Sequence, residues 1–411
     1  MMNMISIIYF ILALILYGFA YLKSKDLLNP LGIGILLWYL ACSLANFDLL
    51  FDYKLQEELS LQTNVCMLLS GLCFVLPICF SYRKNALSLI GYQKIHYGKA
   101  YNFFFNLIVI ASIIAFLYRF QHLIFAPALF SGASNDLKST VPDALPGVNY
   151  IDLFTPYAAI LALIEIKYSL NLSKKRFVIL FCYILFSIIS SLVYKVSRGE
   201  FLIFGLAYLY IYLATKRNKI NFKKMLFILV FVLLFFAVGA MRLSDESRVS
   251  TQFGSGVLNS ILSQIYTYIA INFQNLNALI NSNSELTYVW GGLKFLLKPF
   301  FTYEYDTNQV GLSDYSVGFF NAKTFIYYFY NDLSYVGIII YPLIIGIVVQ
   351  LIYNSMCRDV KYLTLTASLM KAVVFMFFGN YFFGELVLIF PYLLIFFFLT
   401  MMKTINIRVD K

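Results

Sequence analysis

The sequence predicts an all-α polytopic membrane protein with about 11 transmembrane helices (10–12) and one large external loop. Of its 411 residues, 61% are hydrophobic and only 12% are charged, and the mean hydropathy is +0.79. Few soluble proteins have such a composition. Apolar runs of spanning length recur along the chain, and the charges in successive connections alternate in sign, as repeated membrane crossing requires.

The predicted spans follow from runs of about 15–22 mostly apolar residues, close to the length needed to cross a bilayer. The first run has neither a basic start nor a small-residue cleavage site, so we expect a spanning helix and not a cleaved signal. The runs lie at about 3–22, 30–47, 64–82, 101–118, 150–168, 176–193, 200–214, 225–241, 333–354, 364–379 and 386–402.

The charge distribution predicts the orientation. With the basic connections assigned to the cytoplasm, 20 of the 31 Lys and Arg residues lie inside, and 16 of the 20 acidic residues lie outside. The N-terminus is then external and the C-terminus is cytoplasmic. The net charge of +11 is therefore explained by orientation, and it does not indicate a nucleic-acid partner.

We expect three parts: a transmembrane bundle of about eight helices over 1–241, a large loop over 242–332, and about three transmembrane helices over 333–411. Within the loop, apolar residues recur at helical spacing near 256–280, opposite Ser, Gln, Thr and Asn. This pattern predicts an amphipathic helix that is interfacial or re-entrant. A spanning helix is the alternative, and it would reverse the orientation of every later element.

The cysteines predict neither a metal site nor disulfides. All six lie in apolar segments or at a helix end, and none forms a C-x-x-C pair, so we interpret them as packing residues. Glu304 and Asp306 resemble a D-x-D cation clamp, but one acidic pair in a tyrosine-rich loop does not predict a metal. We expect no metal and no cofactor.

Four charged residues at the predicted outer surface are candidates for binding an anion or moving a proton. Arg198 and Glu200 lie in the short turn between the sixth and seventh spans, and Arg242 and Arg248 follow the eighth span. An arginine at that depth needs an acidic partner or an anionic ligand. A guanidinium can bind a diphosphate through paired hydrogen bonds, and a carboxylate can accept a proton. Interfacial anchoring and structural ion pairs are the alternatives.

Further candidates lie later in the loop and in the last outer hairpin. Tyrosine faces stack on sugar rings and acids accept hydrogen bonds from hydroxyls, although tyrosines also gather at membrane interfaces for purely physical reasons. Glu385 is either a second candidate base or the partner of an arginine from the loop. Lys371, within a predicted span, reaches inward to water, pairs with an acid in the bundle, lines a lipid-headgroup cavity or snorkels. The candidate substrate-binding residues are Arg248, Asp306, Lys323, Tyr328, Asp332 and Tyr381.

Four segments carry a resemblance to a known family: K-V-S-R-G-E with the F-L-I-F-G-L-A-Y-L-Y that follows it, G-A-M-R at the start of the large loop, the run from N-A-K-T-F-I-Y-Y to P-L-I-I-G, and F-G-N-Y-F-F-G-E. In layout and in these positions the chain resembles the O-antigen polymerase (Wzy) family. Some relatives space an arginine eleven residues before a glycine in an external loop. In this chain the residues eleven positions after Arg242 and Arg248 are Phe253 and Asn259, so neither arginine has that glycine. The substrate-binding roles of the relatives' loop residues therefore cannot be transferred exactly to this loop.

The resemblance implies a GT-C-like, metal-independent glycosyltransferase in the bacterial inner membrane that joins undecaprenyl-diphosphate-linked repeat units at the periplasmic face. It also implies membrane lipid, a flippase and a chain-length regulator as partners. On this basis we expect catalytic roles for Arg198, Arg242, Glu200 and Glu385.

Two competing functions fit the layout less well. An O-antigen ligase resembling this layout uses a histidine in its large loop, and no histidine occurs between residues 242 and 332. A lipid-linked oligosaccharide flippase or other transporter usually shows repeated halves and ionisable residues along a path. We find no internal repeat in the sequence.

Overall fold

The computed structural model describes residues 4–47, 49, 56–82, 92–125, 148–195, 197–215, 257–282, 286–288, 322–383 and 386–406. The chain folds into two compact units that are each assembled from separate stretches of sequence. Unit 1 contains residues 1–84, 218–351 and 372–386, and unit 2 contains residues 85–217, 352–371 and 387–411. These boundaries differ from the predicted division at residues 241 and 332, which remains a prediction.

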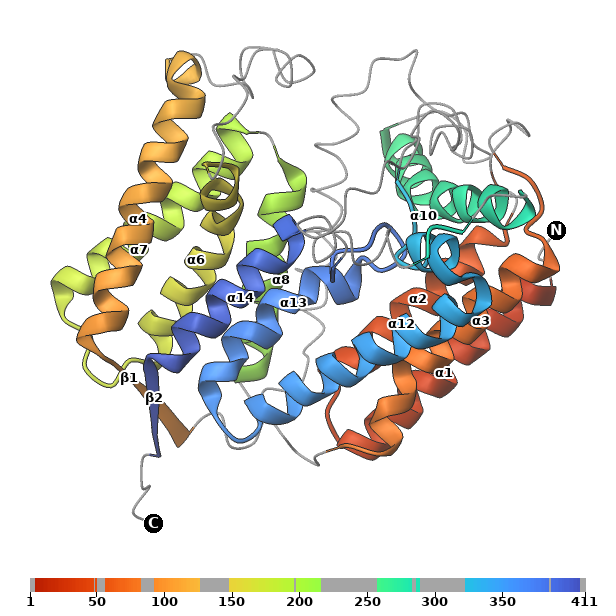
Figure 1. The fold of residues 1–411 in the computed structure, drawn as a ribbon, viewed down its shortest axis with the longest axis horizontal. Helices are drawn as coiled ribbons and strands as arrows, with labels where there is room; N and C mark the ends of the chain where they lie inside the picture. Colours follow the sequence, from red (N-terminus) through yellow and green to blue (C-terminus); the bar gives the residue numbers. More distant parts are fainter. Residues whose placement is uncertain are drawn as a thin grey trace. The chain divides into compact units, whose positions relative to one another are not determined.

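The described chain is mostly helical (Figure 1). Unit 1 holds α1 (Met4–Ser24), α2 (Pro30–Ala45), α3 (Leu61–Val75) with a 3₁₀ turn (Leu76–Cys79), and α10 (Val257–Asn281). Unit 2 holds β1 (Gln93–Tyr97), α4 (Lys99–Phe120), α6 (Val148–Tyr168), α7 (Lys174–Ile189), α8 (Arg198–Thr215) and β2 (Met402–Asn406). The units share α12 (Tyr327–Met356), α13 (Leu363–Val374) and α14 (Leu386–Thr400).

The described helices confirm the membrane character of the chain. Five helical stretches are long and apolar enough to cross a membrane: 4–24, 61–79, 99–120, 174–194 and 327–356. Three shorter apolar helices lie within 30–45, 199–215 and 388–400. Helices are present at every predicted span except 225–241, which lies outside the described residues. The count of eleven spans remains a prediction.

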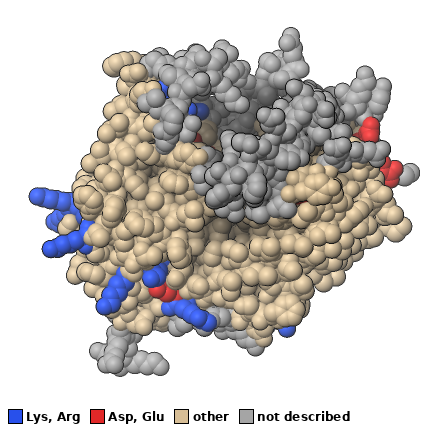
Figure 2. Space-filling model, in the orientation of Figure 1, with Lys and Arg blue, Asp and Glu red and all other residues tan. Residues whose placement is uncertain are grey.

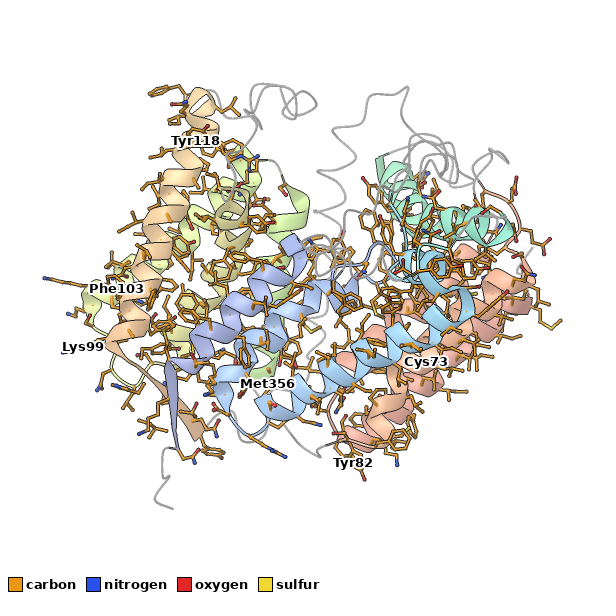
Figure 3. All side chains as sticks on the ribbon, in the orientation of Figure 1. Cys73, Tyr82, Lys99, Phe103, Tyr118 and Met356 are labelled. Atoms are coloured by element: carbon orange, nitrogen blue, oxygen red, sulfur yellow. The ribbon has the colours of Figure 1, made fainter. Side chains whose placement is uncertain are left out.

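The outer surfaces of these helices suit contact with lipid. Charged side chains are sparse over most of the described surface (Figure 2). Along α4, Phe103 and Tyr118 point away from the helix bundle and are 65% and 40% exposed (Figure 3). Large apolar side chains exposed on one face of a spanning helix are expected where that face meets acyl chains.

In unit 1, α1, α2 and α3 pack as an antiparallel group in which several buried polar side chains bond to the backbone of a neighbouring helix. Asn29 caps α2 by accepting hydrogen bonds from the amides of Leu31 and Gly32, and Pro30 begins the helix. Tyr9 donates to the carbonyl of Asn64 at 2.7 Å, and Trp38 donates to that of Met67 at 3.0 Å. Satisfying buried polar groups in this way is required in the absence of water.

Helix α12 approaches α3 so closely that a side chain is excluded at the contact. A Cβ atom at Gly346 would lie 2.2 Å from the carbonyl oxygen of Phe74. Near its start, α12 is kinked at Leu333 and Ser334, and Ser334 has a φ of 52°. The kink brings Gly337 against the carbonyl of Phe329, where a Cβ would lie 2.0 Å away. Glycine is therefore needed at both positions.

The predicted amphipathic helix near 256–280 is α10, and it packs across the end of the α2–α3 hairpin (Figure 1). Tyr266 donates to the carbonyl of Phe47, the Gln274 side chain bonds the backbone of Glu57, and Asn277 accepts from the Ser60 amide at 3.0 Å. All these partners lie at one end of the hairpin. The polar side of α10 is thus buried against protein, and its interfacial or re-entrant position in a membrane remains a prediction.

Unit 2 contains a two-stranded antiparallel sheet that the sequence did not predict. Strand β1 pairs with β2 in the register Gln93↔Asn406 to Tyr97↔Met402. Gln93 fixes the sheet by accepting from the Val360 amide at 2.8 Å and donating to the Arg358 carbonyl at 3.0 Å. Five-residue strands in short basic segments give no hydropathy signal, which is why the sheet was missed.

We predict that Gly346→Ala destabilises the protein by about 1–3 kcal/mol, because its methyl group overlaps the Phe74 carbonyl. Gly18→Ala is the matched control. Gly18 lies in α1 with nothing within 4 Å of its Cβ position, and alanine there should be neutral or stabilising by up to about 1 kcal/mol. Thermal unfolding of the purified protein in detergent measures both. Equal unfolding temperatures for the two variants would contradict the packing argument.

Candidate functional site

The predicted site residues divide between the two units. Arg198 and Glu200 belong to unit 2, whereas Lys323, Tyr328, Asp332 and Tyr381 belong to unit 1. The side chain of Arg198 lies outside the described part of the structure, although its backbone begins α8. Arg242, Arg248, Asp306 and Glu385 lie outside the described residues altogether.

Glu200 lies in a buried group of ion pairs that we call the charge network, formed by Arg119, Asp152, Lys195 and Glu200. The Lys195 ammonium bridges two carboxylates, with Nζ 2.5 Å from Asp152 Oδ1 and 2.8 Å from Glu200 Oε2. The second oxygen of Asp152 accepts from Arg119 Nη1 at 2.6 Å. The Lys195 and Asp152 side chains are both only 5% exposed.

The turn that presents Lys195 and Glu200 is built by local hydrogen bonds. Helix α7 continues as a π-helical turn, Ser190–Tyr194, whose geometry is uncommon and often marks functional sites. The amide of Ser197 donates to the Ser191 carbonyl at 2.8 Å. The Ser197 hydroxyl then accepts from the amide of Glu200 at 3.3 Å and caps the start of α8.

Helix α6 supplies the centre of unit 2 and has a buried carboxylate near each end. Residues 158–162 of this helix are fully buried. Asp152 joins the charge network, and near the other end Glu165 is held by Arg176 through bonds of 2.7 and 2.9 Å. Neighbouring helices thus neutralise both carboxylates, as buried charges require.

Lys371 approaches the same turn from α13. Its Nζ atom lies 3.6 Å from the position that a Cβ would take at Gly199. The alternatives for Lys371, among them an acid partner in the bundle, remain predictions.

The charge network and the β1–β2 sheet lie at opposite ends of unit 2. Helix α4 begins at Lys99, directly after β1, and carries Arg119 in its last turn. The 20 residues between them correspond to about 30 Å of helix, which is about the thickness of the hydrocarbon core. The basic residues Lys94, Lys99, Lys361 and Lys403 belong to the sheet end. The unit is therefore long enough to place its two ends at opposite membrane surfaces.

Sequence reasoning missed Arg119 and Asp152. Both are charges close to the ends of apolar spans at 101–118 and 150–168, and both fall on the predicted outer side. That shared position is the signal that would have found them. Their pairing was not visible, because 33 residues separate them in the chain.

The pKa of Lys195 is raised above its ordinary value. Burial alone would lower the pKa of this lysine, but the charges of Glu200 and Asp152 and the hydrogen bonds to both carboxylates outweigh burial. Lys195 therefore stays an ammonium ion at neutral pH, and its contribution to stability depends on that charge.

In unit 1, Lys323 lies against tyrosine rings. Its Nζ atom is 4.4 Å from the centroid of the Tyr327 ring and 5.7 Å from that of Tyr328. Burial lowers the pKa of Lys323. The segment around Lys323 is held by two hydrogen bonds. Asn275 of α10 donates to the Ala322 carbonyl at 2.7 Å, and the Phe325 amide donates to the Met376 carbonyl.

Two other predicted ligands in unit 1 are largely enclosed. Asp332 is fully buried, and its carboxylate accepts hydrogen bonds from the hydroxyls of Thr287 and Tyr341. The kink after Asp332 leaves backbone carbonyls of the helix without helical partners. The amide of Thr287 donates to the carbonyl of Asn331, and the amide of Tyr288 donates to the carbonyl of Asp332. Burial raises the pKa of Tyr381 to about 12. Sugar contacts by Asp332 and Tyr381 remain predictions.

Within the described residues, no three His, Cys, Asp or Glu side chains lie close enough to hold a metal ion. Comparisons with models of protein families, with curated proteins and with solved structures found no match to this chain.

We predict that Lys195→Met destabilises the protein by about 3–5 kcal/mol, because it leaves two buried carboxylates facing each other. Lys99→Met, at an exposed lysine, is the control. Because the folded-state pKa of Lys195 is raised, its contribution is fully present below pH 10.5 and is lost as the pH rises above that value. Unfolding temperatures of wild type and Lys195→Met should therefore converge in strong alkali. A constant difference would contradict the role of the charge.

Proposed function

We propose that this chain is an O-antigen polymerase, a glycosyltransferase of the bacterial inner membrane that joins undecaprenyl-diphosphate-linked repeat units at the periplasmic face. The charge network is the observation that supports it best. The network holds two cations, Arg119 and Lys195, against two carboxylates near the start of α8, and Lys371 approaches the same turn. The sequence places Arg198 at the first position of that helix. Cations gathered in an apolar bundle need acidic partners or an anionic ligand.

The proposed reaction needs positive charge at the membrane surface. When the glycosidic bond of the donor breaks, the electron pair stays on the departing polyprenyl diphosphate, and negative charge develops there in the transition state. Positioned cations stabilise such a leaving group, each by about 3 kcal/mol. We assign this role to Arg198 and Arg242, with Arg248 in support.

A carboxylate must accept the proton of the attacking sugar hydroxyl, and Glu200 or Glu385 is assigned that role. Glu200 is held in place before substrate binds, because its Oε2 atom accepts from Lys195 at 2.8 Å and from Ser191 at 3.4 Å. A fixed carboxylate of this kind is suited to orient a hydroxyl group.

Carbohydrate contact is assigned to unit 1. The Tyr328 ring, partly exposed beside Lys323, offers a flat surface for a sugar ring, and the ammonium of Lys323 offers donors to its oxygen atoms. Asp306, Asp332 and Tyr381 complete the proposed set of sugar ligands. No cofactor is invoked, and a flippase and a chain-length regulator are the proposed protein partners.

A transporter of lipid-linked oligosaccharides is the second candidate, because buried ionisable groups in an apolar bundle also line transport paths. An O-antigen ligase is the third candidate function. The surface glycan of a null mutant discriminates among them. Caps of a single repeat unit indicate a polymerase, absent caps with retained lipid-linked polymer indicate a ligase, and cytoplasmic accumulation of lipid-linked units indicates a flippase.

We predict that Arg198→Ala and Arg242→Ala each lower polymerisation of repeat units in membranes by about 100-fold, the usual effect of removing a positioned electrostatic donor. The measurement is the length distribution of lipid-linked glycan, with protein level followed in parallel. If both variants made long chains at normal expression, the assignment of these arginines would be wrong. A topology reporter that placed residues 242–332 in the cytosol would contradict the proposed function itself.

We also predict that Tyr328→Ala shortens the polymer, because loss of a stacking ring weakens sugar binding by about 0.5–1.5 kcal/mol. Tyr328→Phe retains the ring and should retain long chains. Tyr118→Ala, which removes an exposed tyrosine from α4, is the control. Equal chain lengths for Tyr328→Ala and the control would rule out stacking at this position.

A further inference from the structure

We propose that the sheet end of unit 2 binds an anionic phospholipid, whose phosphate contacts Lys99 and Lys403 and whose acyl chains lie along α4 and α14. The surface belongs to the end of unit 2 opposite the charge network, so the proposal does not depend on the proposed function.

The outer face of the β1–β2 sheet carries exposed basic side chains. Successive side chains of a strand point to opposite faces, and here Ile95 of β1 and Met402 of β2 are buried. Their chain neighbours His96 and Lys403 are exposed, and the register places these two residues directly opposite each other. The sheet therefore buries one face against unit 2 and presents the other to its surroundings.

Lys99 extends this basic surface onto α4. It follows β1 by two residues and is exposed. A Cβ at Gly98 would lie 3.9 Å from the carbonyl oxygen of Met401, so the chain entering α4 lies beside the chain entering β2. Figure 2 shows Lys and Arg side chains gathered at the lower left of the described surface, where unit 2 carries its sheet.

The two lysines have no acidic partner among the residues that the structure describes. Asp359, a partly exposed acid at this end, lies 3.5 Å from the Lys361 ammonium and accepts a hydrogen bond from the Thr404 hydroxyl. Lys99 and Lys403 thus keep their charge available to a ligand. Exposed lysines at a membrane surface attract anionic lipid headgroups.

An exposed apolar face of α4 begins directly beyond Lys99. Residues three or four apart share one face of a helix, and Phe103, Leu107, Ile110 and Ile114 follow Lys99 at that spacing. All four are more than half exposed. Lys99 and Phe103 extend from the same side of the helix (Figure 3). A cation at the end of such a face matches a ligand that has an anionic head and an apolar tail.

Helix α14 widens the apolar surface. The ring of Phe397 in α14 contacts that of Phe104 in α4, with 5.5 Å between centroids, and both rings are partly exposed. Leu393 and Phe396 of α14 are exposed as well. The surface therefore spans two neighbouring helices, which suits the two acyl chains of a phospholipid. Both helices connect to the sheet, α4 through β1 and α14 through β2, so the cations lie at the same end of both.

The alternative is that these lysines serve only to set the orientation of the chain during membrane insertion. That role ends once the protein has folded, and it requires no preference for an anionic lipid afterwards. Binding to the purified, folded protein therefore separates the two roles.

The experiment measures binding of tail-labelled fluorescent dioleoyl phosphatidylglycerol to the purified full-length protein in dodecyl maltoside micelles at physiological salt. A lysine near a membrane surface contributes about 5-fold in affinity for an anionic lipid, so we expect about 25-fold weaker binding by the double variant Lys99→Gln/Lys403→Gln. Labelled dioleoyl phosphatidylcholine should bind more weakly and equally to wild type and variant. The matched control is Lys174→Gln/Lys175→Gln, which removes two exposed lysines from the first turn of α7 and should retain most of the affinity.

Several results would overturn the proposal. Equal affinity of the wild type for the two lipids would mean that no anionic lipid is preferred. An equal loss in the α7 control would mean that the attraction comes from diffuse surface charge. Displacement of the labelled lipid by inorganic phosphate would mean a site for free phosphate, because phosphate makes no contact with the apolar surface. Should the double variant fail to unfold cooperatively, Lys99→Gln and Lys403→Gln are tested singly, and unchanged binding by both would contradict the proposed contacts.

Discussion

Unit 2 depends on the neutralisation of two carboxylates on its central helix. Asp152 and Glu165 lie near opposite ends of α6, and each is almost completely buried. Removing a carboxylate from water costs several kcal/mol, which only a close cation and complementary hydrogen bonds can offset. The cations come from other helices, Arg119 from α4 and Arg176 from α7. These pairs therefore fix which helices lie next to α6 and in which direction each runs.

The same constraint gives the candidate site its form. Lys195 bridges Asp152 and Glu200, so the position of Glu200 is tied through one ammonium ion to the core of the unit. A carboxylate on a short turn would otherwise sample many conformations. Side chains that must act on a substrate benefit from such support, because small displacements cost much of their effect. The site is thus an extension of the packing that stabilises the helices.

Sequence alone predicted the parts of this fold that have a local signal. Hydropathy located the apolar helices among the described residues, and the 3.6-residue period located α10 to within one residue at either end. The partners of Asp152 and Asp332 were not predictable in this way. Arg119 lies 33 residues from Asp152, and Thr287 lies 45 residues from Asp332. The burial of Asp332 also depends on the kink at Leu333 and Ser334, where neither residue is a proline or a glycine that would predict a kink. Arg198 and Glu200 were found because a charged turn between two apolar spans is itself a local signal.

The β1–β2 pairing has a consequence for biosynthesis. Strand β1 leaves the ribosome about 300 residues before strand β2, which occupies residues 402–406. The early helices of unit 2 are therefore synthesised long before the strand that pairs with β1, and β1 lacks its hydrogen-bonding partner until residues 402–406 have been made.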